Sequence, residues 1–279
     1  MTATGIVGLA GHTYAVERNW GRLPPDIAPA MISQIAVDRS GRVDAIQRGD
    51  PPVVVFTPDG SFAGADGSGR IFDSHGAYID RSDRFFLADR DAHEIIVFSS
   101  DGSELFALGT RHRPQWAAPF NHPTDAAVAD DGDIYVSDGY RNARIHRFAA
   151  DGTLLGSWGE VGHGPGQFMT PHAVWVDREN RVLVVDREND RVQVFTRDGT
   201  WLADWRGLCR PMDIFETPAG HLLVTDQVPS LTAFAADGTR IGRCRPSLNG
   251  AHGIFGDSAG NVYLAEIQPN CITKMRLLD

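Results

Sequence analysis

The stretch FNHPTDAAVADDGDIYVSDGYRNARIHRFAADGTLLGSWGE at residues 120–160 has a counterpart in FMTPHAVWVDRENRVLVVDRENDRVQVFTRDGTWLADWRG at residues 168–207. Each stretch has an apolar segment, a polar turn, a second apolar segment ending in Asp, a third segment, an Asp-Gly dipeptide and a fourth segment ending near Trp. Short runs rich in Val, Ile and aromatic residues, separated by such turns, are typical of antiparallel strands. Four strands per repeat predict one blade of a β-propeller.

The same frame fits the chain six times. The residue that opens the first strand is followed 14 positions later by the residue that ends the second, in the pairs Ser33/Gln47, His75/Asp89, Thr124/Asp138, His172/Asp186, Met212/Asp226 and His252/Glu266. This step is the length of a two-strand hairpin, so both members lie at the same end of a blade. We predict an all-β protein in which residues 1–279 form a single six-bladed β-propeller of four-stranded blades, at about 32–70, 71–111, 120–160, 168–208, 209–246 and 249–279.

The sixth repeat ends after three strands and lacks the fourth strand that ends in Trp. The N-terminal segment TYAVERNWG, residues 13–21, ends in Trp-Gly like the fourth strand at residues 156–159. We expect segment 13–21 to supply the missing outer strand and to close the ring. Closure would remove edges that otherwise pair with other chains.

Composition narrows the function classes. Of the 279 residues 42% are hydrophobic, and 26 basic against 36 acidic residues give a formal charge of −10, a balance that opposes nucleic-acid binding. The longest apolar runs, such as 53–56, are as short as a strand, so we expect no association with a membrane. Three scattered cysteines and an N-terminus unlike a signal peptide predict a cytoplasmic protein. We expect the isolated propeller to be a monomer.

Histidine recurs at the position that opens the first strand. In a propeller these positions line the channel, and around the ring they read Ser33, His75, Thr124, His172, Met212 and His252. Imidazoles from alternate blades approach the axis from three directions, and three of them with one open position form a catalytic zinc site. We predict that His75, His172 and His252 bind Zn²⁺ or another divalent transition metal. The alternative is a structural, hydrogen-bonded role, which we expect for His122.

Arginines and a tyrosine follow the residue that ends the second strand. Arg48, Arg90 and Arg187 come one position later and Tyr140 two positions later, so all four are expected near the histidines. Guanidinium groups bind carboxylates with two hydrogen bonds, which indicates a small anionic substrate, and a phenol beside a metal can serve as a base. Salt bridges between blades are the alternative role, above all for Arg187. The aspartates that end the second strands recur in nearly every blade, so we expect them to be structural: Asp89, Asp138, Asp186 and Asp226.

Several motifs resemble one known family. They are PTDAAV and YVSDGYRNARI in the third repeat, GPGQF, TPHAV and VDRENDRVQVF in the fourth, and more weakly HGAYID, QRGD and AHGIF. The repeat is similar to the NHL type, and the details resemble peptidyl-α-hydroxyglycine α-amidating lyase, the second catalytic half of the peptide-amidating enzyme. The resemblance implies a six-bladed propeller with zinc on His75, His172 and His252, a catalytic Tyr140, and substrate-side Arg48 and Arg187.

The resemblance also implies a reaction. A peptidylamidoglycolate lyase-like enzyme cleaves the C–N bond of a carbinolamide, here a peptidyl- or N-acyl-α-hydroxyglycine, to an amide and an aldehyde such as glyoxylate. Zinc would polarise the substrate hydroxyl, and Tyr140 as a phenolate would remove its proton. Arg187 and Arg48 would hold the carboxylate and the developing charge.

The sequence departs from the family pattern at three places. The family's structural calcium uses two carbonyls, which would be those of Ile35 and Ala77, and an aspartate that is Gly253 here. A site without its carboxylate binds calcium weakly, so structural Ca²⁺ is not among the expected cofactors. A family methionine is Gly250, which changes the substrate pocket, and a cysteine of secreted members is Arg141, which fits an intracellular protein.

Two other classes of function fit the same pattern. The first is another metal-dependent propeller enzyme, a lactonase-like hydrolase or a related lyase, acting on a different small molecule. The lost methionine and aspartate would suit such a changed substrate. The second is a non-catalytic NHL platform for protein binding, which a metal-free protein would favour.

Overall fold

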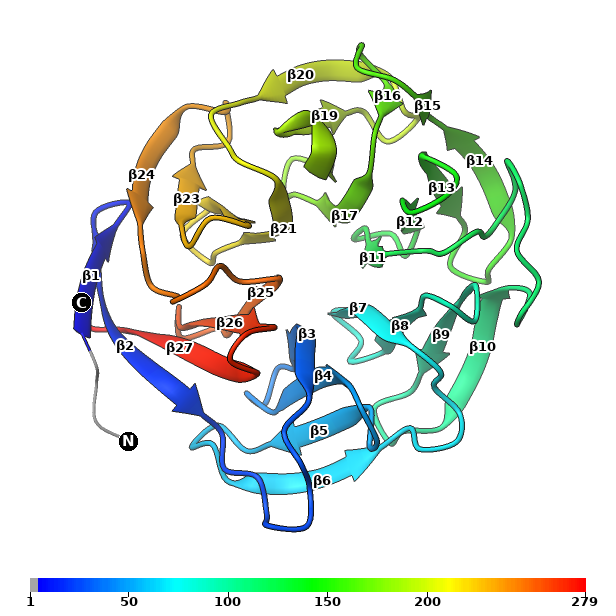
Figure 1. Ribbon diagram of the computed structural model, residues 1–279. Helices are drawn as coiled ribbons and strands as arrows, with labels where there is room; N and C mark the ends of the chain where they lie inside the picture. Colours follow the sequence, from blue (N-terminus) through cyan, green and yellow to red (C-terminus); the bar gives the residue numbers. More distant parts are fainter. Residues whose placement is uncertain (1–4) are drawn as a thin grey trace. The chain divides into compact units, whose positions relative to one another are not determined.

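The computed structural model describes residues 5–279, whose main sheets are antiparallel and consist mostly of four consecutive strands (Figure 1). The chain divides into two compact units. Residues 71–211 form the central unit, and residues up to 70 together with 212–279 form the terminal unit. Each unit holds three of these sheets, which we number blades 1 to 6 in chain order. Residues 1–4 of the predicted domain lie outside the described residues, and a single domain over 1–279 stays a prediction.

The central unit holds blades 2, 3 and 4. Their strands are β7 (Ser74–Ile79), β8 (Phe85–Asp89), β9 (Glu94–Phe98) and β10 (Glu104–Gly109); β11 (Asp125–Val128), β12 (Ile134–Asp138), β13 (Arg144–Phe148) and β14 (Leu154–Trp158); and β17 (Pro171–Val176), β18 (Val182–Asp186), β19 (Arg191–Phe195) and β20 (Trp201–Trp205). A short parallel pair, β15 (Glu160–Val161) and β16 (Gln167–Phe168), and the 3₁₀ turn η1 (Arg187–Asn189) lie in the connections.

The terminal unit holds blades 1, 5 and 6. Blade 1 consists of β3 (Met31–Val37), β4 (Val43–Arg48), β5 (Val53–Phe56) and β6 (Phe62–Asp66), and blade 5 of β21 (Pro211–Glu216), β22 (Leu222–Asp226), β23 (Leu231–Phe234) and β24 (Arg240–Cys244). Blade 6 consists of β25 (Gly253–Gly256), β26 (Val262–Glu266), β27 (Cys271–Leu277), β2 (His12–Trp20) and β1 (Gly5–Leu9).

Blade 6 joins the two ends of the described chain. Strand β2 pairs antiparallel with β27, with Tyr14 opposite Leu277, so the predicted N-terminal strand does complete the sixth blade. Strand β1 then pairs with β2 and gives this blade a fifth strand that the repeat pattern did not predict. Its Gly-Ile-Val-Gly-Leu sequence is short and has no partner repeat from which to predict it.

The strand register confirms the predicted hairpins. Ser74 lies opposite Asp89 in blade 2, and Pro171 lies opposite Asp186 in blade 4. The Asp-Gly turns use the conformational freedom of glycine: Gly152 has a φ of 87°, and its amide donates to the Ala149 carbonyl at 2.9 Å. A residue with a side chain would strain this turn.

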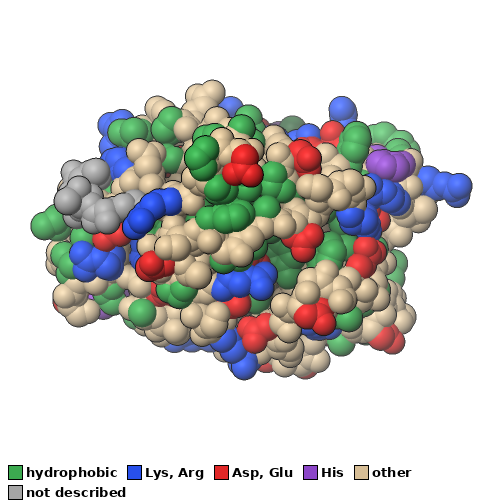
Figure 2. Space-filling model, turned by 90° about the horizontal axis from the view of Figure 1, so that it is seen from below, with side chains coloured by type: hydrophobic (Ala, Val, Ile, Leu, Met, Phe, Trp, Pro, Cys, Tyr) green, Lys and Arg blue, Asp and Glu red, His purple; other side chains and the backbone are tan. Residues whose placement is uncertain are grey.

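Apolar side chains of neighbouring blades form the core of the central unit. One cluster includes Phe86, Ile95 and Phe148, and a second includes Tyr135 and Phe195. Within residues 5–279 no helix has the length and apolar character that crossing a bilayer requires. On the face in Figure 2, basic and acidic side chains are interspersed, and hydrophobic side chains gather in its upper middle part.

Candidate metal and catalytic site

The aspartates that end the second strands fix the segments that lead into the first strands. The Asp89 carboxylate accepts the backbone N–H groups of Phe72 at 2.8 Å and Asp73 at 2.7 Å. In the same way Asp186 accepts the N–H of Met169 at 3.0 Å. Their role is therefore structural, as the sequence predicted, and it holds in place the backbone just before each ring histidine.

Two ring histidines of the central unit face each other. His75 and His172 are each 2% exposed, and their ring centroids are 4.9 Å apart with an interplanar angle of 65°. The Nδ1 of His75 lies 2.8 Å from the carbonyl oxygen of Thr124, the residue at the same ring position in blade 3. A carbonyl can only accept, so Nδ1 carries the proton and Nε2 keeps its lone pair.

Two glycines allow neighbouring blades to approach this closely. A Cβ on Gly76 would lie 2.3 Å from the Thr124 carbonyl oxygen, the same atom that accepts from His75. A Cβ on Gly139 would lie 2.0 Å from the carbonyl oxygen of Pro171. Both distances are below any real contact, so these positions need glycine to bring the functional side chains together.

Tyr140, in the turn after β12, contacts both of these histidines. Its hydroxyl lies 2.9 Å from Nε2 of His75 and 3.3 Å from Nε2 of His172. The Nη1 group of Arg187 donates to the same hydroxyl at 3.4 Å. A phenol held against two imidazoles and beside a guanidinium can exchange a proton at this point.

A second arginine lies against the Tyr140 ring. The Cζ atoms of Arg90 and Arg187 are each 5.4 Å from the ring centroid. The spacing predicts Arg90 near the histidines but carries no information about its contact with the tyrosine ring. The signal was the shared pattern of an end-of-strand aspartate, an arginine and an acidic residue, at 89–91 and again at 186–188.

The remaining predicted residues lie in the terminal unit. His252 is 7% exposed, and its Nδ1 lies 2.7 Å from the carbonyl oxygen of Ser33, its ring equivalent in blade 1. Arg48 ends β4 opposite Met31 and is half-buried. The central unit thus brings together four of the six predicted site residues: His75, His172, Tyr140 and Arg187.

The surroundings of Gly253 explain the departure from the calcium ligand pattern. A Cβ at this position would lie 2.3 Å from Oε1 and 2.8 Å from the backbone Cα of Gln34, so an aspartate would require the backbone of blade 1 to shift. The Gln34 amide instead donates to Oδ2 of Asp213 at 2.7 Å, and the same oxygen accepts the N–H of Ile254 at 2.8 Å. Burial raises the pKa of Asp213 to about 6.

His122 makes contacts of the structural kind. Its backbone N–H donates to Nδ1 of His93 at 3.2 Å, and the two rings lie 4.4 Å apart. Burial lowers the pKa of both imidazoles, which favours their neutral forms.

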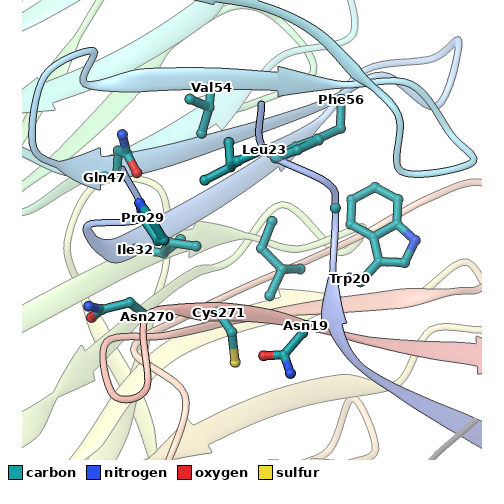
Figure 3. A pocket seen from close by; sticks show the side chains of 12 residues that line it. Asn19, Trp20, Leu23, Pro29, Ile32, Gln47, Val54, Phe56, Asn270 and Cys271 are labelled. Carbon is teal, nitrogen blue, oxygen red and sulfur yellow. The ribbon is translucent and has the colours of Figure 1, made fainter. Parts of the chain in front are cut away.

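A cavity of about 220 Å³ lies in the terminal unit under the connection from β2 to β3 (Figure 3). Its walls include Trp20, Leu23, Phe56 and Cys271. Burial raises the pKa of the Cys271 thiol, so the reactive thiolate is scarce. The amides of Asn19, Gln47 and Asn270 complete the walls, so the cavity is a mainly apolar space without an activated nucleophile.

The fold matches solved propeller structures. A gluconolactonase from Xanthomonas campestris superimposes with a TM-score of 0.72 at 14% identity, covering 100% of this chain and 99% of that chain. At this identity the likeness concerns the fold alone. With five sheets of four consecutive strands and a sixth that joins the two ends of the described chain, it shows that the protein is an all-β, six-bladed β-propeller.

The sequence relatives give the family. The NHL repeat model matches residues 120–148 and 168–195. Human NHL repeat-containing protein 3 is 33% identical over 238 residues, which cover 77% of this chain and 67% of the relative. Peptidyl-alpha-hydroxyglycine alpha-amidating lyase 1 of Drosophila melanogaster is 34% identical over 170 residues, 54% of this chain and 31% of that protein. The chain belongs to this NHL-repeat family, and the resemblance to the amidating lyases is confirmed.

Proposed function

We propose that this protein is a metal-dependent lyase that cleaves the C–N bond of a carbinolamide, a peptidyl- or N-acyl-α-hydroxyglycine-like compound, to an amide and an aldehyde such as glyoxylate. The observation that carries the proposal is the position of Tyr140. Its hydroxyl contacts Nε2 of two buried histidines and accepts a hydrogen bond from Arg187. Sequence relatives named as amidating lyases support the same chemistry.

The donor set suits a divalent transition metal, zinc first. The proposal assigns the ion to His75, His172 and His252, which are buried and occupy equivalent positions in alternate blades of the propeller. In His75 and His252 the Nδ1 proton is fixed on a carbonyl oxygen, so each presents Nε2 as a ligand atom. Because Gln34 fills the space where a carboxylate at 253 would stand, structural Ca²⁺ is not part of the proposal.

The chain's own residues would move the proton and hold the substrate. A metal bound by the histidines would supply Lewis acidity at the substrate hydroxyl. Tyr140, ionised, would accept the hydroxyl proton; the C–O bond becomes a carbonyl, and the C–N electron pair leaves with the amide nitrogen, which then takes a proton. Arg187 would stabilise the charge on the Tyr140 oxygen, and Arg187 and Arg48 would hold the substrate carboxylate.

Product analysis tests this function. The zinc-loaded protein is incubated with N-benzoyl-α-hydroxyglycine, and benzamide and glyoxylate are quantified against a blank that measures spontaneous decay. The proposal expects the two products in equal amounts at a rate well above the blank. A rate equal to the blank would contradict it.

The same assay includes the alternative enzyme class. Gly250 and Gly253 replace family residues at the proposed site, which would suit a different small substrate. Gluconolactone, offered in parallel, would be hydrolysed by a lactonase-like enzyme and left intact by the lyase proposed here. Turnover of neither compound would favour the non-catalytic platform.

We also propose that the protein acts as a cytoplasmic monomer on a small anionic substrate, without nucleic acid or membrane. The formal charge of −10 and the three free cysteines support this setting. Light scattering coupled to size exclusion checks the oligomeric state: a mass near 30.4 kDa is expected, and a mass near twice that value would contradict the monomer.

A further inference from the structure

Tyr140 is flanked by two arginines that come from its two neighbouring blades. Arg90 follows β8 of blade 2, Arg187 follows β18 of blade 4, and both Cζ atoms are 5.4 Å from the Tyr140 ring centroid. Each arginine also bonds to the acidic residue that follows it, Asp91 at 2.8 Å and Glu188 at 2.9 Å. The Tyr140 ring therefore has two guanidinium groups at the same distance, one from each neighbouring blade.

The two arginines differ in how they are held. The guanidinium of Arg90 forms ion pairs with two carboxylates, those of Asp73 and Asp91. Its backbone N–H donates to the Asp73 carbonyl at 2.9 Å, and that of Arg187 donates in the same way to the Thr170 carbonyl at 2.9 Å, so the difference lies in the side chains. Two carboxylates leave Arg90 little capacity to bind a further anion, and they hold its charge in one place against the ring.

The Arg187 side chain has one carboxylate partner instead of two, and it reaches the Tyr140 hydroxyl. Its carboxylate partner Glu188 also pairs with Arg210 at 2.7 Å, so one acidic group serves two cations. The Nη1 group of Arg187 then donates to the Tyr140 hydroxyl at 3.4 Å. The two arginines therefore have different positions: Arg187 contacts the hydroxyl oxygen of Tyr140, and Arg90, held by two carboxylates, lies against the Tyr140 ring.

We propose that Arg90, anchored by Asp73 and Asp91, is a positioning residue for Tyr140. Its guanidinium keeps the ring at the histidines through a cation–π contact, with 5.4 Å between the Cζ atom and the ring centroid. This assignment rests on the function proposed above. The family resemblance assigns only Arg48 and Arg187, so Arg90 is an addition to that set.

The test compares Arg90 with Arg84 at the opposite end of β8. Arg84 makes the same kinds of contact, with its Cζ 5.2 Å from the Phe86 ring and its Nε 2.7 Å from Asp80, and the two side chains are 23% and 22% exposed. We expect Arg90→Gln to lower kcat for N-benzoyl-α-hydroxyglycine about tenfold, with KM within threefold and metal content unchanged. Arg84→Gln should keep kcat, and Arg90→Lys, which retains the charge but not the fork of donors, should lie between.

A second readout does not depend on turnover. In the crystal structure of Arg90→Gln we expect the Tyr140 hydroxyl to leave its 2.9 Å contact with His75 Nε2 or the ring to become disordered. This measurement separates the two proposals. If the wild-type protein has no lyase activity, the proposed function is wrong, but the crystal structures still show whether Arg90 positions Tyr140.

Three results would overturn the role of Arg90. They are an unchanged kcat in Arg90→Gln, a raised KM at constant kcat, which would make Arg90 a substrate ligand, and an unmoved Tyr140 in the crystal structure. If Arg90→Gln does not fold, Asp91→Asn is the variant that tests the role, because it keeps Arg90 and removes one of its two ion pairs. A kcat lowered severalfold in Asp91→Asn supports the positioning role, and an unchanged kcat rejects it.

Discussion

The central and terminal units are built from the same repeat but carry different chemistry. In both, the Nδ1 group of a ring histidine bonds to a carbonyl oxygen of the next blade, His75 to Thr124 and His252 to Ser33. The central unit adds a second histidine and a tyrosine between arginines. One position after the ring residues Ser33 and Met212, the terminal unit has the buried Gln34–Asp213 hydrogen bond. The repeat therefore fixes where side chains stand, and substitutions at a few positions decide what they do.

Loss of the Tyr140 hydroxyl should lower kcat more than any other change considered for the central unit. Tyr140→Phe keeps the ring and its cation contacts but removes the group that touches His75 and His172. We expect kcat to fall by about 10²–10⁴-fold, the usual contribution of general acid–base catalysis, with metal content unchanged. Steady-state kinetics on N-benzoyl-α-hydroxyglycine measure it.

The matched control is a tyrosine of the terminal unit. Tyr14→Phe removes a hydroxyl from β2, far along the sequence from the proposed catalytic residues, and should leave kcat within a factor of two. If Tyr140→Phe kept kcat within a few fold of wild type, the central unit would lose its assigned role in proton transfer.

The second largest effect is expected from a methyl group at Gly76, because it would displace the Thr124 carbonyl oxygen that positions His75. The added Cβ would stand 2.3 Å from the Thr124 carbonyl oxygen, a backbone atom that cannot swing aside. We expect Gly76→Ala to lower the free energy of unfolding by about 2–3 kcal/mol and to weaken metal binding. Urea unfolding and metal titration measure the two effects.

Gly156→Ala provides the control in the same unit. Gly156 lies in the exposed strand β14 and nothing stands within 4 Å of a Cβ built there, so this change should be within about 0.5 kcal/mol of wild type. Equal stabilities of the two variants would show that the close approach of blades 2 and 3 is not required.

The buried acid of the terminal unit should give a smaller, pH-dependent effect. Burial raises the pKa of Asp213 in the folded protein to about 6, above the unfolded value near 3.9. Below about pH 4 the group is protonated in both states, and as pH rises through 6 its ionised form costs stability. The stability of wild type relative to Asp213→Asn should therefore fall by about 2 kcal/mol between pH 4 and pH 7.

Denaturant unfolding of both proteins across that pH range measures the difference. A difference that stays constant or grows with pH would mean that the N–H donors from Gln34, Ile214 and Ile254 outweigh burial and hold Asp213 ionised.

The sequence predicted the features that recur with the repeat. The 14-residue step located the hairpins, the ring position of His75 and His172, and the structural aspartates, because each follows from strand register. The same step placed Tyr140 near the histidines, and the family motifs added its catalytic role. Contacts across blades were beyond this reasoning: the Arg90 stacking and the Gln34–Asp213 pair depend on how two repeats meet, and spacing within one repeat carries no information about that.

The metal content of the purified protein tests the central claim most directly. Wild type, His172→Ala from the central unit, His252→Ala from the terminal unit and the control His163→Ala, whose imidazole is in an exposed loop, are dialysed and analysed by mass spectrometry. We expect about one zinc per chain in wild type and His163→Ala, and its loss in the other two variants. Wild-type protein that takes up no transition metal even when zinc is offered would contradict the account, leaving the ring histidines structural and the protein a binding platform.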